Sequence, residues 1–339
     1  MVPAYNQLIK DLQKRAFVCV YLFHGEEPFF IDELSGYLEA NMLNEMEKEF
    51  NQTILYGRDT QAVMAVNYCK QFPMVGNQQL IVVREAQDMD FKKDESIQAL
   101  LTYFNQPSPS SILVLAFKYK KAPAPFIKLL SAAANAVVYE SKRIKESELN
   151  NWILNQVNNK GYTITGKACT MLAEFLGNNL EKIVNELSKL FINHPKNQQI
   201  TEEVIEKYIG ISKDYNTFEL INAIANKNII KTNKIIHYFA LNPKENSIFK
   251  TIPMLFGFFS KLLLIHSLPD KSEANITAKA KLNYYSKPDY IVGYRNYSPN
   301  RIIEIISWIR ECNVRAIGVE NYSVDEGELL RELVFKILH

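Results

Sequence analysis

The first 140 residues alternate short, nearly continuous apolar runs with stretches that carry apolar residues at helical spacing. The five runs are rich in Val, Ile, Leu, Phe and Tyr, and they cover residues 18–23, 52–56, 80–84, 112–117 and 136–139. Strands that are covered on both faces have this composition, and strands that alternate with helices form parallel sheets. The segment is therefore predicted to be an α/β domain with a mostly parallel sheet.

The pattern changes after Glu140, and the remainder of the chain shows helical spacing with no convincing strand. Four helices are expected next: one capped by Ser147, one over about 166–176, one over 180–191 and one capped by Thr201. The segment 211–339 is also helical by its spacing, and its last helix places apolar residues on one face from Leu329 to the end of the chain. The predicted fold class is α/β plus all-α, with domains at 1–140, 141–210 and 211–339.

The composition of the 339 residues is that of a globular protein, with 47% hydrophobic and 22% charged residues. The formal net charge is +2, so any basic surface has to be local. Four widely spaced cysteines, without a C-x-x-C pair, favour small core residues over a zinc site or a disulfide framework. With no signal-peptide pattern and no comfortable membrane span, we expect a soluble cytoplasmic protein without a membrane partner.

The loop after the first predicted strand is where a nucleotide-binding α/β domain holds phosphates with backbone N–H groups and a lysine. Here Gly25 is followed by Glu26, Glu27 and Pro28, and the G-x-x-x-x-G-K-[ST] pattern is absent. The two carboxylates repel a phosphate, and the proline removes an N–H donor. We therefore expect no cofactor and no ATP binding of the usual kind.

No other catalytic set emerges from the residues. The five histidines lack metal-ligand spacing among themselves or with cysteine, and G-x-S-x-G is missing. The remaining enzyme hypothesis is a P-loop-derived enzyme with a nonstandard nucleotide site.

One apolar turn, Phe72-Pro73-Met74-Val75-Gly76, lies between a predicted helix and the third predicted strand. Pro73 ends the helix and Gly76 permits a sharp turn, which presents Met74 and Val75 at a helix end. An adaptable Met beside an apolar neighbour suits insertion into a partner's pocket. The residues alone favour the simpler interpretation, in which the turn only covers the core, and Pro73 favours an inward-facing Phe72.

A basic segment spans residues 227–301, where twelve Lys and Arg face four acidic residues, a local balance of +8. Five tyrosines lie in the same segment and are able to stack on bases: Tyr284, Tyr285, Tyr290, Tyr294 and Tyr297. Tyr322, before the last predicted helix, is a further candidate of this kind. The alternatives are a stand-alone DNA-binding module, or a solvated helical face above core tyrosines, and the residues leave both open.

The order and spacing of several motifs resemble the delta-subunit family of the bacterial DNA polymerase III clamp loader, a catalytically silent branch of the AAA+ group. The motifs in the α/β segment are residues 21–29 (YLFHGEEPF), 72–76 (FPMVG) and 80–86 (LIVVREA). In the helical segment they run from Leu149, Trp152 and Ile153 through Gly161 and Gly177-Asn178-Asn179-Leu180 to Phe218-Glu219-Leu220. The match covers essentially the whole chain.

This resemblance implies a degenerate AAA+ domain, a helical lid-like domain and a helical collar domain for assembly. It implies binding of the beta sliding clamp, which the family grips with two apolar residues at a helix end that match Met74 and Val75, with Phe72 and Pro73 beside them. The implied partners are the ATPase (gamma/tau) and delta-prime subunits and primed DNA within the complex. The resemblance therefore implies that the chain has no active site of its own and acts in DNA replication as a subunit of the DNA polymerase III holoenzyme.

Overall fold

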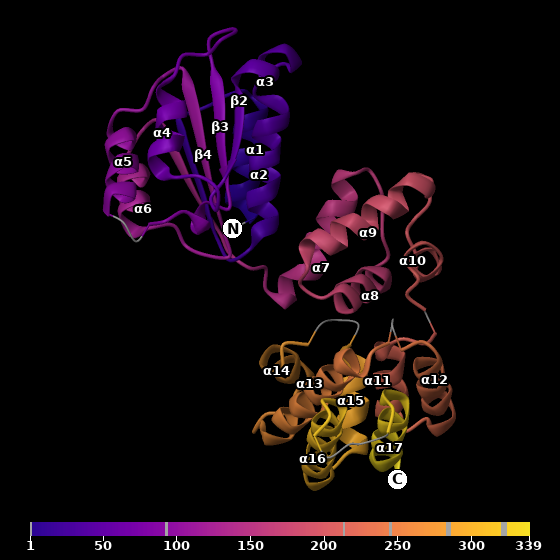
Figure 1. Cartoon of the computed structure of the whole chain (residues 1–339). Helices are drawn as coiled ribbons and strands as arrows, with labels where there is room; N and C mark the ends of the chain where they lie inside the picture. Colours follow the sequence, from indigo (N-terminus) through magenta and orange to yellow (C-terminus); the bar gives the residue numbers. More distant parts are fainter. Residues whose placement is uncertain (1, 92–93, 213, 244–245, 283–285, 320–323) are drawn as a thin grey trace. The chain divides into compact units, whose positions relative to one another are not determined.

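The structure is a computed structural model that describes residues 2–91, 94–212, 214–243, 246–282, 286–319 and 324–339. The chain forms two compact units, Met1–Ile144 and Lys145–His339, and each is described by itself. The first unit is α/β and the second is helical, as the change of pattern after Glu140 predicts (Figure 1). The further division of the helical part near residue 210 stays a prediction.

Five strands form the sheet of the first unit, in the order β2-β3-β4-β1-β5. Their bounds are Val20–Gly25 (β1), Gln52–Tyr56 (β2), Gln79–Arg84 (β3), Ser111–Lys118 (β4) and Ala136–Ser141 (β5). Every pair of neighbours is parallel. Each predicted run is therefore a strand, and the predicted parallel sheet is confirmed.

Helices cover both faces of this sheet (Figure 1). They are α1 (Val2–Gln13), α2 (Pro28–Asn41), α3 (Glu45–Asn51), α4 (Ala62–Lys70), the 3₁₀ turn η1 (Ala86–Asp88), α5 (Asp94–Asn105) and α6 (Ala124–Ser131). The face that carries Val20, Leu22 and Ile81 packs on α4, α5 and α6. Because side chains alternate along a strand, Tyr21 and Phe23 point to the other face, which α1 and α2 cover.

The second unit consists of helices in the described residues. They are α7 (Glu146–Asn159), α8 (Gly166–Leu176), α9 (Leu180–Asn193), α10 (Glu202–Ile209), α11 (Thr217–Ala225), α12 (Ile229–Leu241), α13 (Ile248–Ser267), α14 (Glu273–Lys279), α15 (Lys287–Asn296), α16 (Pro299–Ala316) and α17 (Glu326–Leu338). Thr201 is the N-cap residue of α10 as predicted. Ser147 is not a cap: it lies inside α7, which begins after Lys145 because Glu146 and Glu148 both fit its first turn.

Among the described residues, α13 is the one helix with the length and apolar composition to cross a membrane. Its residues Leu255, Phe259 and Leu262 are fully buried in the apolar core of the helical unit. The neighbouring α16 and α17 supply the rest of that core, including Ile305 and Leu333. Core helices of globular proteins reach this composition, and the packing of α13 places it in that class.

The four cysteines are free, and Cys69, Cys169 and Cys312 are buried. Burial raises the pKa of Cys69 to about 12 and the pKa of Cys169 to about 11. A thiol at such a pKa stays protonated near neutral pH and is a poor nucleophile or metal ligand. These cysteines therefore act as small core residues.

Candidate protein-binding site

The apolar turn between α4 and β3 stands out from the surface of the α/β unit. Phe72 is 86% exposed and Met74 is 78% exposed, whereas Pro73 and Val75 are half-buried. The prediction that Phe72 faces inward is wrong: after Pro73 breaks the helix at Lys70, the chain has left the core. The two outward apolar side chains are therefore Phe72 and Met74, and Val75 contributes only part of its surface.

The buried side chain of Asn51, the last residue of α3, holds the backbone of this turn. Its Oδ1 accepts hydrogen bonds from the N–H groups of Met74 at 2.8 Å and Val75 at 3.2 Å. Its Nδ2 donates to the carbonyl oxygens of Val75 and Gln78, the latter at 3.1 Å. All four hydrogen-bonding capacities of the amide are used, so the turn has a fixed conformation.

A second buried amide fixes the start of the turn. Gln79 Nε2 donates to the carbonyl oxygen of Gln71 at 2.6 Å and to Ser111 Oγ at 2.8 Å. Ser111 in turn donates to the carbonyl oxygen of Cys69 at 2.6 Å. These hydrogen bonds tie the end of α4 to β3 and β4. Residues 71–78 therefore form an ordered turn whose backbone is fixed by hydrogen bonds.

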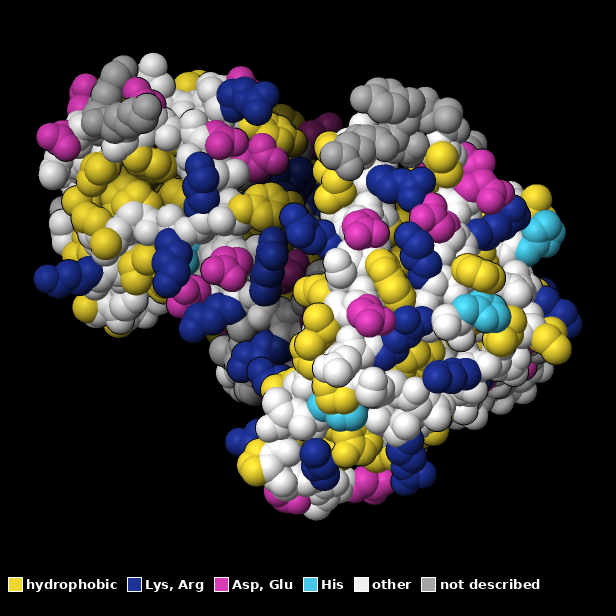
Figure 2. All heavy atoms as spheres, turned by 90° about the horizontal axis from the view of Figure 1, so that it is seen from below, with side chains coloured by type: hydrophobic (Ala, Val, Ile, Leu, Met, Phe, Trp, Pro, Cys, Tyr) yellow, Lys and Arg dark blue, Asp and Glu magenta, His cyan; other side chains and the backbone are white. Residues whose placement is uncertain are grey.

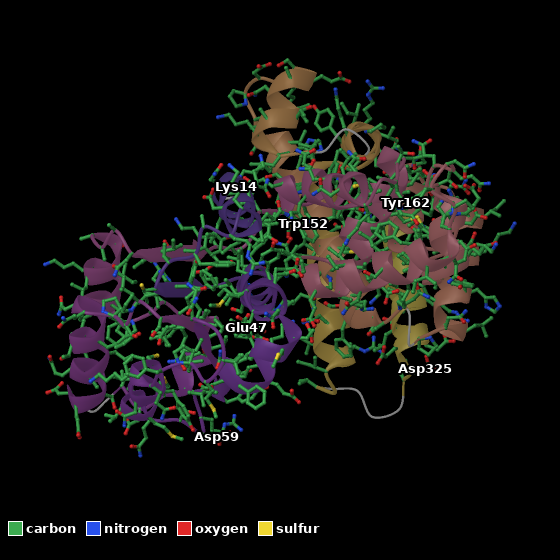
Figure 3. All side chains as sticks on the ribbon, turned by 90° about the horizontal axis from the view of Figure 1, so that it is seen from above. Lys14, Glu47, Asp59, Trp152, Tyr162 and Asp325 are labelled. Atoms are coloured by element: carbon green, nitrogen blue, oxygen red, sulfur yellow. The ribbon has the colours of Figure 1, made fainter. Side chains whose placement is uncertain are left out.

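Gly76 completes the turn with a φ of +72°, a left-handed conformation that glycine adopts without strain. A Cβ at this position would approach Glu47 Oε1 to 2.4 Å, so α3 and the turn pack closely together here. Glu47 lies on α3, as Figure 3 shows. Both segments directly precede a strand, which places them at the edge of the sheet where its parallel strands begin.

Sequence reasoning missed α3 and its role. The helix has seven residues and no clear apolar spacing, but Asn44 and Glu47 form a capping box at its start. That N-x-x-E pattern is the signal that could have located it. Nothing local marks Asn51 as the anchor, because its partners lie more than twenty residues away in the chain.

Asn51→Ala is expected to free the turn. The four backbone groups that Asn51 satisfies lose their partner, which costs about 2–3 kcal/mol of stability. Hydrogen exchange should show fast amides at Met74 and Val75. Asn44→Ala, which removes a helix cap worth about 1 kcal/mol, is the matched control and should leave both amides slow. Slow amides in Asn51→Ala would contradict the anchoring role.

The opposite end of the sheet, where its parallel strands finish, carries the loop 25–28 that follows β1. Its N–H groups bond within the protein: Gly25 donates to the Lys120 carbonyl at 3.0 Å, and Glu26 donates to the Ser141 carbonyl at 2.7 Å. Ser141 Oγ donates to the Glu27 carbonyl at 2.7 Å. The donors that would surround a phosphate are thus engaged by the end of β5 and by the segment after β4.

The carboxylate of Glu27 caps the first turn of α2 and accepts from the Phe29 N–H at 3.2 Å. It stands where an anion would meet the positive end of this helix. Burial raises the pKa of Glu27, while the Phe29 N–H and the charge of Arg143 lower it. The helix terminus already holds a carboxyl group of the chain itself.

His24 is buried beside this loop, and neither ring nitrogen has a hydrogen-bond partner among the described residues. Burial lowers the pKa of His24 below its ordinary 6.5; Glu140 raises the pKa and Lys121 lowers it further. Glu140 and Lys121 form an ion pair with each other at 2.9 Å. The imidazole is therefore neutral in the folded chain at neutral pH.

This burial predicts acid sensitivity of the α/β unit. Because the unfolded chain binds a proton at His24 more readily than the folded one, stability is complete above pH 6.5 and falls as the pH drops toward the lowered folded pKa. Denaturant unfolding of wild type and His24→Leu at about pH 7.5 and about pH 5.5 measures the difference. The variant should lose less stability on acidification, and equal losses would contradict the assignment.

Comparison with known proteins gives the same family that the motifs indicate. A family model described as DNA polymerase III, delta subunit, matches residues 21–141, which include the turn 71–78 and all of the five strands except Val20, the first residue of β1. The chain is 22% identical over 259 residues to DNA polymerase III subunit delta of Bacillus subtilis (strain 168), covering 75% of this chain and 74% of that protein. The resemblance to the delta-subunit family is confirmed.

A probable DNA polymerase III subunit delta of Aquifex aeolicus (strain VF5) is 21% identical over 266 residues, covering 75% of this chain and 72% of that protein. The solved structure of the Bacillus subtilis DNA clamp loader delta protein covers 98% of this chain and 99% of its own, with a TM-score of 0.58 at 20% identity. This structural likeness extends the delta-subunit fold to the helical unit. The predicted fold class, AAA+-like α/β followed by helical domains, is confirmed.

The basic segment 227–301 lies in the helical unit, where the tyrosines are mostly core residues. Tyr290 and Tyr297 are buried, so they are not free to stack on bases, and Tyr294 is half-buried. Tyr284, Tyr285 and Tyr322 lie outside the described residues. Three lysines lie over the rings of Tyr290, Tyr294 and Tyr297: Lys261, Lys271 and Lys227.

On the face in Figure 2, Lys and Arg of the helical unit are interspersed with acidic and apolar side chains rather than gathered in one patch. Several of these cations also have anionic partners, such as Lys231 with Glu219 and Lys287 with Glu273. On this face the segment is a solvated helical face above core tyrosines, and the alternative of a DNA-binding surface stays a prediction.

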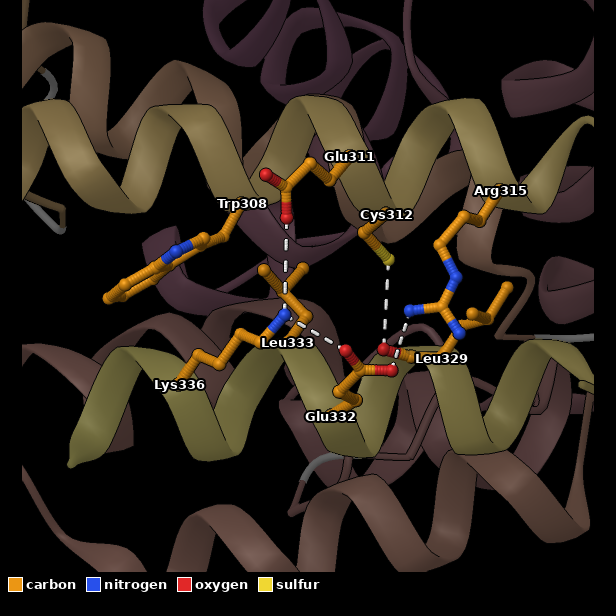
Figure 4. A pocket seen from close by; sticks show the side chains of 8 residues that line it. All are labelled: Trp308, Glu311, Cys312, Arg315, Leu329, Glu332, Leu333 and Lys336. Atoms are coloured by element: carbon orange, nitrogen blue, oxygen red, sulfur yellow. Dashed lines mark hydrogen bonds and ion pairs between the residues drawn. The ribbon is translucent and has the colours of Figure 1, made fainter. Parts of the chain in front are cut away.

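A cavity between α16 and α17 measures about 10 Å³, room for no more than one water molecule (Figure 4). Glu332 bridges its walls, with ion pairs to Arg315 at 2.7 Å and Lys336 at 2.9 Å. The same two cations lower the pKa of Glu332. The arrangement joins the two helices and offers no ligand site. Within the described ranges, no group of three or more His, Cys, Asp or Glu is placed to hold a metal.

Proposed function

We propose that this chain binds the beta sliding clamp through the turn 71–78 and helps to open it for loading onto primed DNA. The observation that carries the proposal is the anchored turn, which holds Phe72 and Met74 outward on a fixed backbone. Single exposed apolar residues are ordinary, but two large ones on a rigid projection form a ready-made plug for an apolar pocket. Val75 and Pro73 complete the contact.

Burial of two such side chains contributes roughly 3–5 kcal/mol before ordering costs. Because two buried amides already fix the backbone, little further ordering is needed on binding. The plug favours an open or strained clamp only by the difference between its affinities for the open and closed states. The proposal therefore requires that Phe72 and Met74 fit the pocket better in the open clamp than in the closed clamp.

The chain is proposed to work without nucleotide of its own, as a non-catalytic part of the polymerase III assembly. The closed loop at Gly25 and the carboxylate of Glu27 at the start of α2 support this proposal. The ATPase (gamma/tau) and delta-prime subunits would then bind through the helical collar region 211–339, with primed DNA held by the complex in the cytoplasm.

Titration with labelled ATP and Mg²⁺ tests whether the loop after β1 binds nucleotide. We expect no saturable binding up to about 1 mM, because bound phosphate would have to displace Ser141 and meet Glu27. Saturable ATP binding that is lost on addition of a third negative charge to the loop, as in Pro28→Asp, would instead favour the P-loop-derived enzyme.

Reconstituted clamp loading tests the proposed function as a whole. The ATPase and delta-prime subunits, the clamp and primed DNA are combined with and without this chain, and loaded clamp is separated from free clamp. Loading should require the chain. Loading at full rate without it would contradict the proposal, and steeply salt-dependent duplex binding by the chain alone would favour a DNA-binding module.

A further inference from the structure

Helix α3 lies directly against the anchored turn. Asn51 at its end bonds to Met74 and Val75, and Glu47 one turn earlier meets Gly76. Glu47 and Asn51 are four residues apart, so they lie on one face of the helix, and that face is turned to the residues 71–78. Any surface that approaches the turn closely therefore also comes near α3.

The neighbouring face of α3 is apolar and exposed. Met46 is 65% exposed and Phe50 is 50% exposed, and their spacing of four residues places them side by side. Each precedes a turn-facing residue by one position, a rotation of about 100° around the helix. Met46 and Phe50 thus flank the turn, and together with Phe72 and Met74 they supply four large exposed apolar side chains on two adjoining segments.

The size of a stable interface requires more than the turn. A standard protein interface buries about 800 Å² on each partner and involves about 20–30 residues a side. The turn offers eight residues, two of them with large exposed apolar side chains. The missing area has to come from surface next to the turn, and α3 supplies the two exposed apolar side chains of Met46 and Phe50 there.

The charges around this surface indicate the chemistry of its partner. Helix α3 carries Glu45, Glu47 and Glu49 against Lys48, which pairs with Glu45 at 2.6 Å, so the net charge of the helix is −2. Residues 71–78 carry no charge, and the exposed Lys70 precedes them. An apolar centre with an acidic rim fits an apolar groove with a basic rim.

We infer that Met46 and Phe50 of α3 form a second apolar contact to the same sliding clamp that the turn grips. The inference rests on the proposed function and assigns to the clamp a groove wide enough for both segments. The turn supplies the plug, and α3 excludes water from one side of it.

The test uses the full chain and the sliding clamp of its own organism. Met46→Ser/Phe50→Ser should weaken equilibrium binding by about tenfold without abolishing it. Met64→Ser is the matched control: Met64 is an exposed Met near the start of α4, away from the turn, and its replacement should leave the affinity unchanged. All three positions are exposed, so folding should be retained, and circular dichroism checks this.

The outcomes separate the inference from the proposed function. Wild-type affinity in the double variant, together with loss of binding in Met74→Asp, overturns the α3 contact and leaves the plug in place. A double variant that binds the clamp normally but fails to enter the assembled loader assigns α3 to another subunit, which also overturns the inference. No clamp binding by wild type overturns both.

Discussion

Met74→Asp is expected to lower the affinity of the chain for the sliding clamp by at least about a hundredfold. The substitution removes about 2 kcal/mol of apolar burial and places a carboxylate in an apolar pocket, where it has no partner. The backbone of the turn should persist, because Asn51 bonds to main-chain groups and not to the Met74 side chain. Equilibrium titration of labelled clamp measures the effect.

Ile192→Asp is the matched control for this experiment. Ile192 lies on α9 in the helical unit and is 80% exposed, close to the exposure of Met74, so the same new charge is placed on an equally open surface. It should leave clamp binding unchanged. Phe72→Asp should act like Met74→Asp, because Phe72 is the more exposed of the two. Wild-type affinity in both turn variants would move the contact elsewhere on the chain.

Gly25→Ala is expected to destabilise the α/β unit by at least about 3 kcal/mol. Gly25 has a φ of +134°, and a Cβ there would come within 2.0 Å of the Ser141 carbonyl oxygen. All the atoms that this Cβ would meet belong to the main chain of Ser141 at the end of β5, which cannot move away without loss of its pairing with β1. The glycine is thus required by the close approach between the loop after β1 and Ser141.

Gly161→Ala separates steric conflict from conformational strain. Gly161 has a φ of +80° with nothing within 4 Å of its Cβ position, so its replacement should cost only about 1 kcal/mol. Both tryptophans, Trp152 and Trp308, lie in the helical unit, and fluorescence does not follow the α/β unit. Hydrogen exchange of β1 and β5 is the better measurement, and equal protection in the two variants would contradict the role of Gly25.

The strands were predictable because a buried parallel strand is marked by its own residues. The runs around Leu22, Val82 and Val114 are apolar on both faces, and helical spacing takes over where they end. Helices such as α8 and α17 were predictable for a similar local reason: an apolar stripe bounded by caps.

The candidate site was predictable only in part. Its residues are neighbours in the sequence, but the choice between a core-covering turn and an exposed plug depends on Asn51 and Gln79, whose partners are distant in the chain. Pro73 ends the helix, but the outward position of Phe72 also depends on those anchors, which hold the backbone of the turn. The buried state of Tyr290 and Tyr297 likewise depends on packing against α13, which composition does not reveal.

The turn 71–78 and the loop after β1 lie at opposite ends of the parallel strands, so the length of the strands separates them. β3 has six residues and spans about 20 Å between the turn at its start and the end of the sheet where the loop 25–28 lies. The turn is exposed in the chain without any nucleotide, and both of its amide anchors come from the same unit. Clamp binding should therefore require neither ATP nor the other subunits.

The most direct test is equilibrium binding of the wild-type chain to the sliding clamp of its own organism, in the absence of nucleotide and of other loader subunits. We predict saturable binding of unchanged strength when ATP and Mg²⁺ are added. Absence of binding under these conditions, with the fold verified, would contradict the account of a preformed and exposed clamp-binding turn.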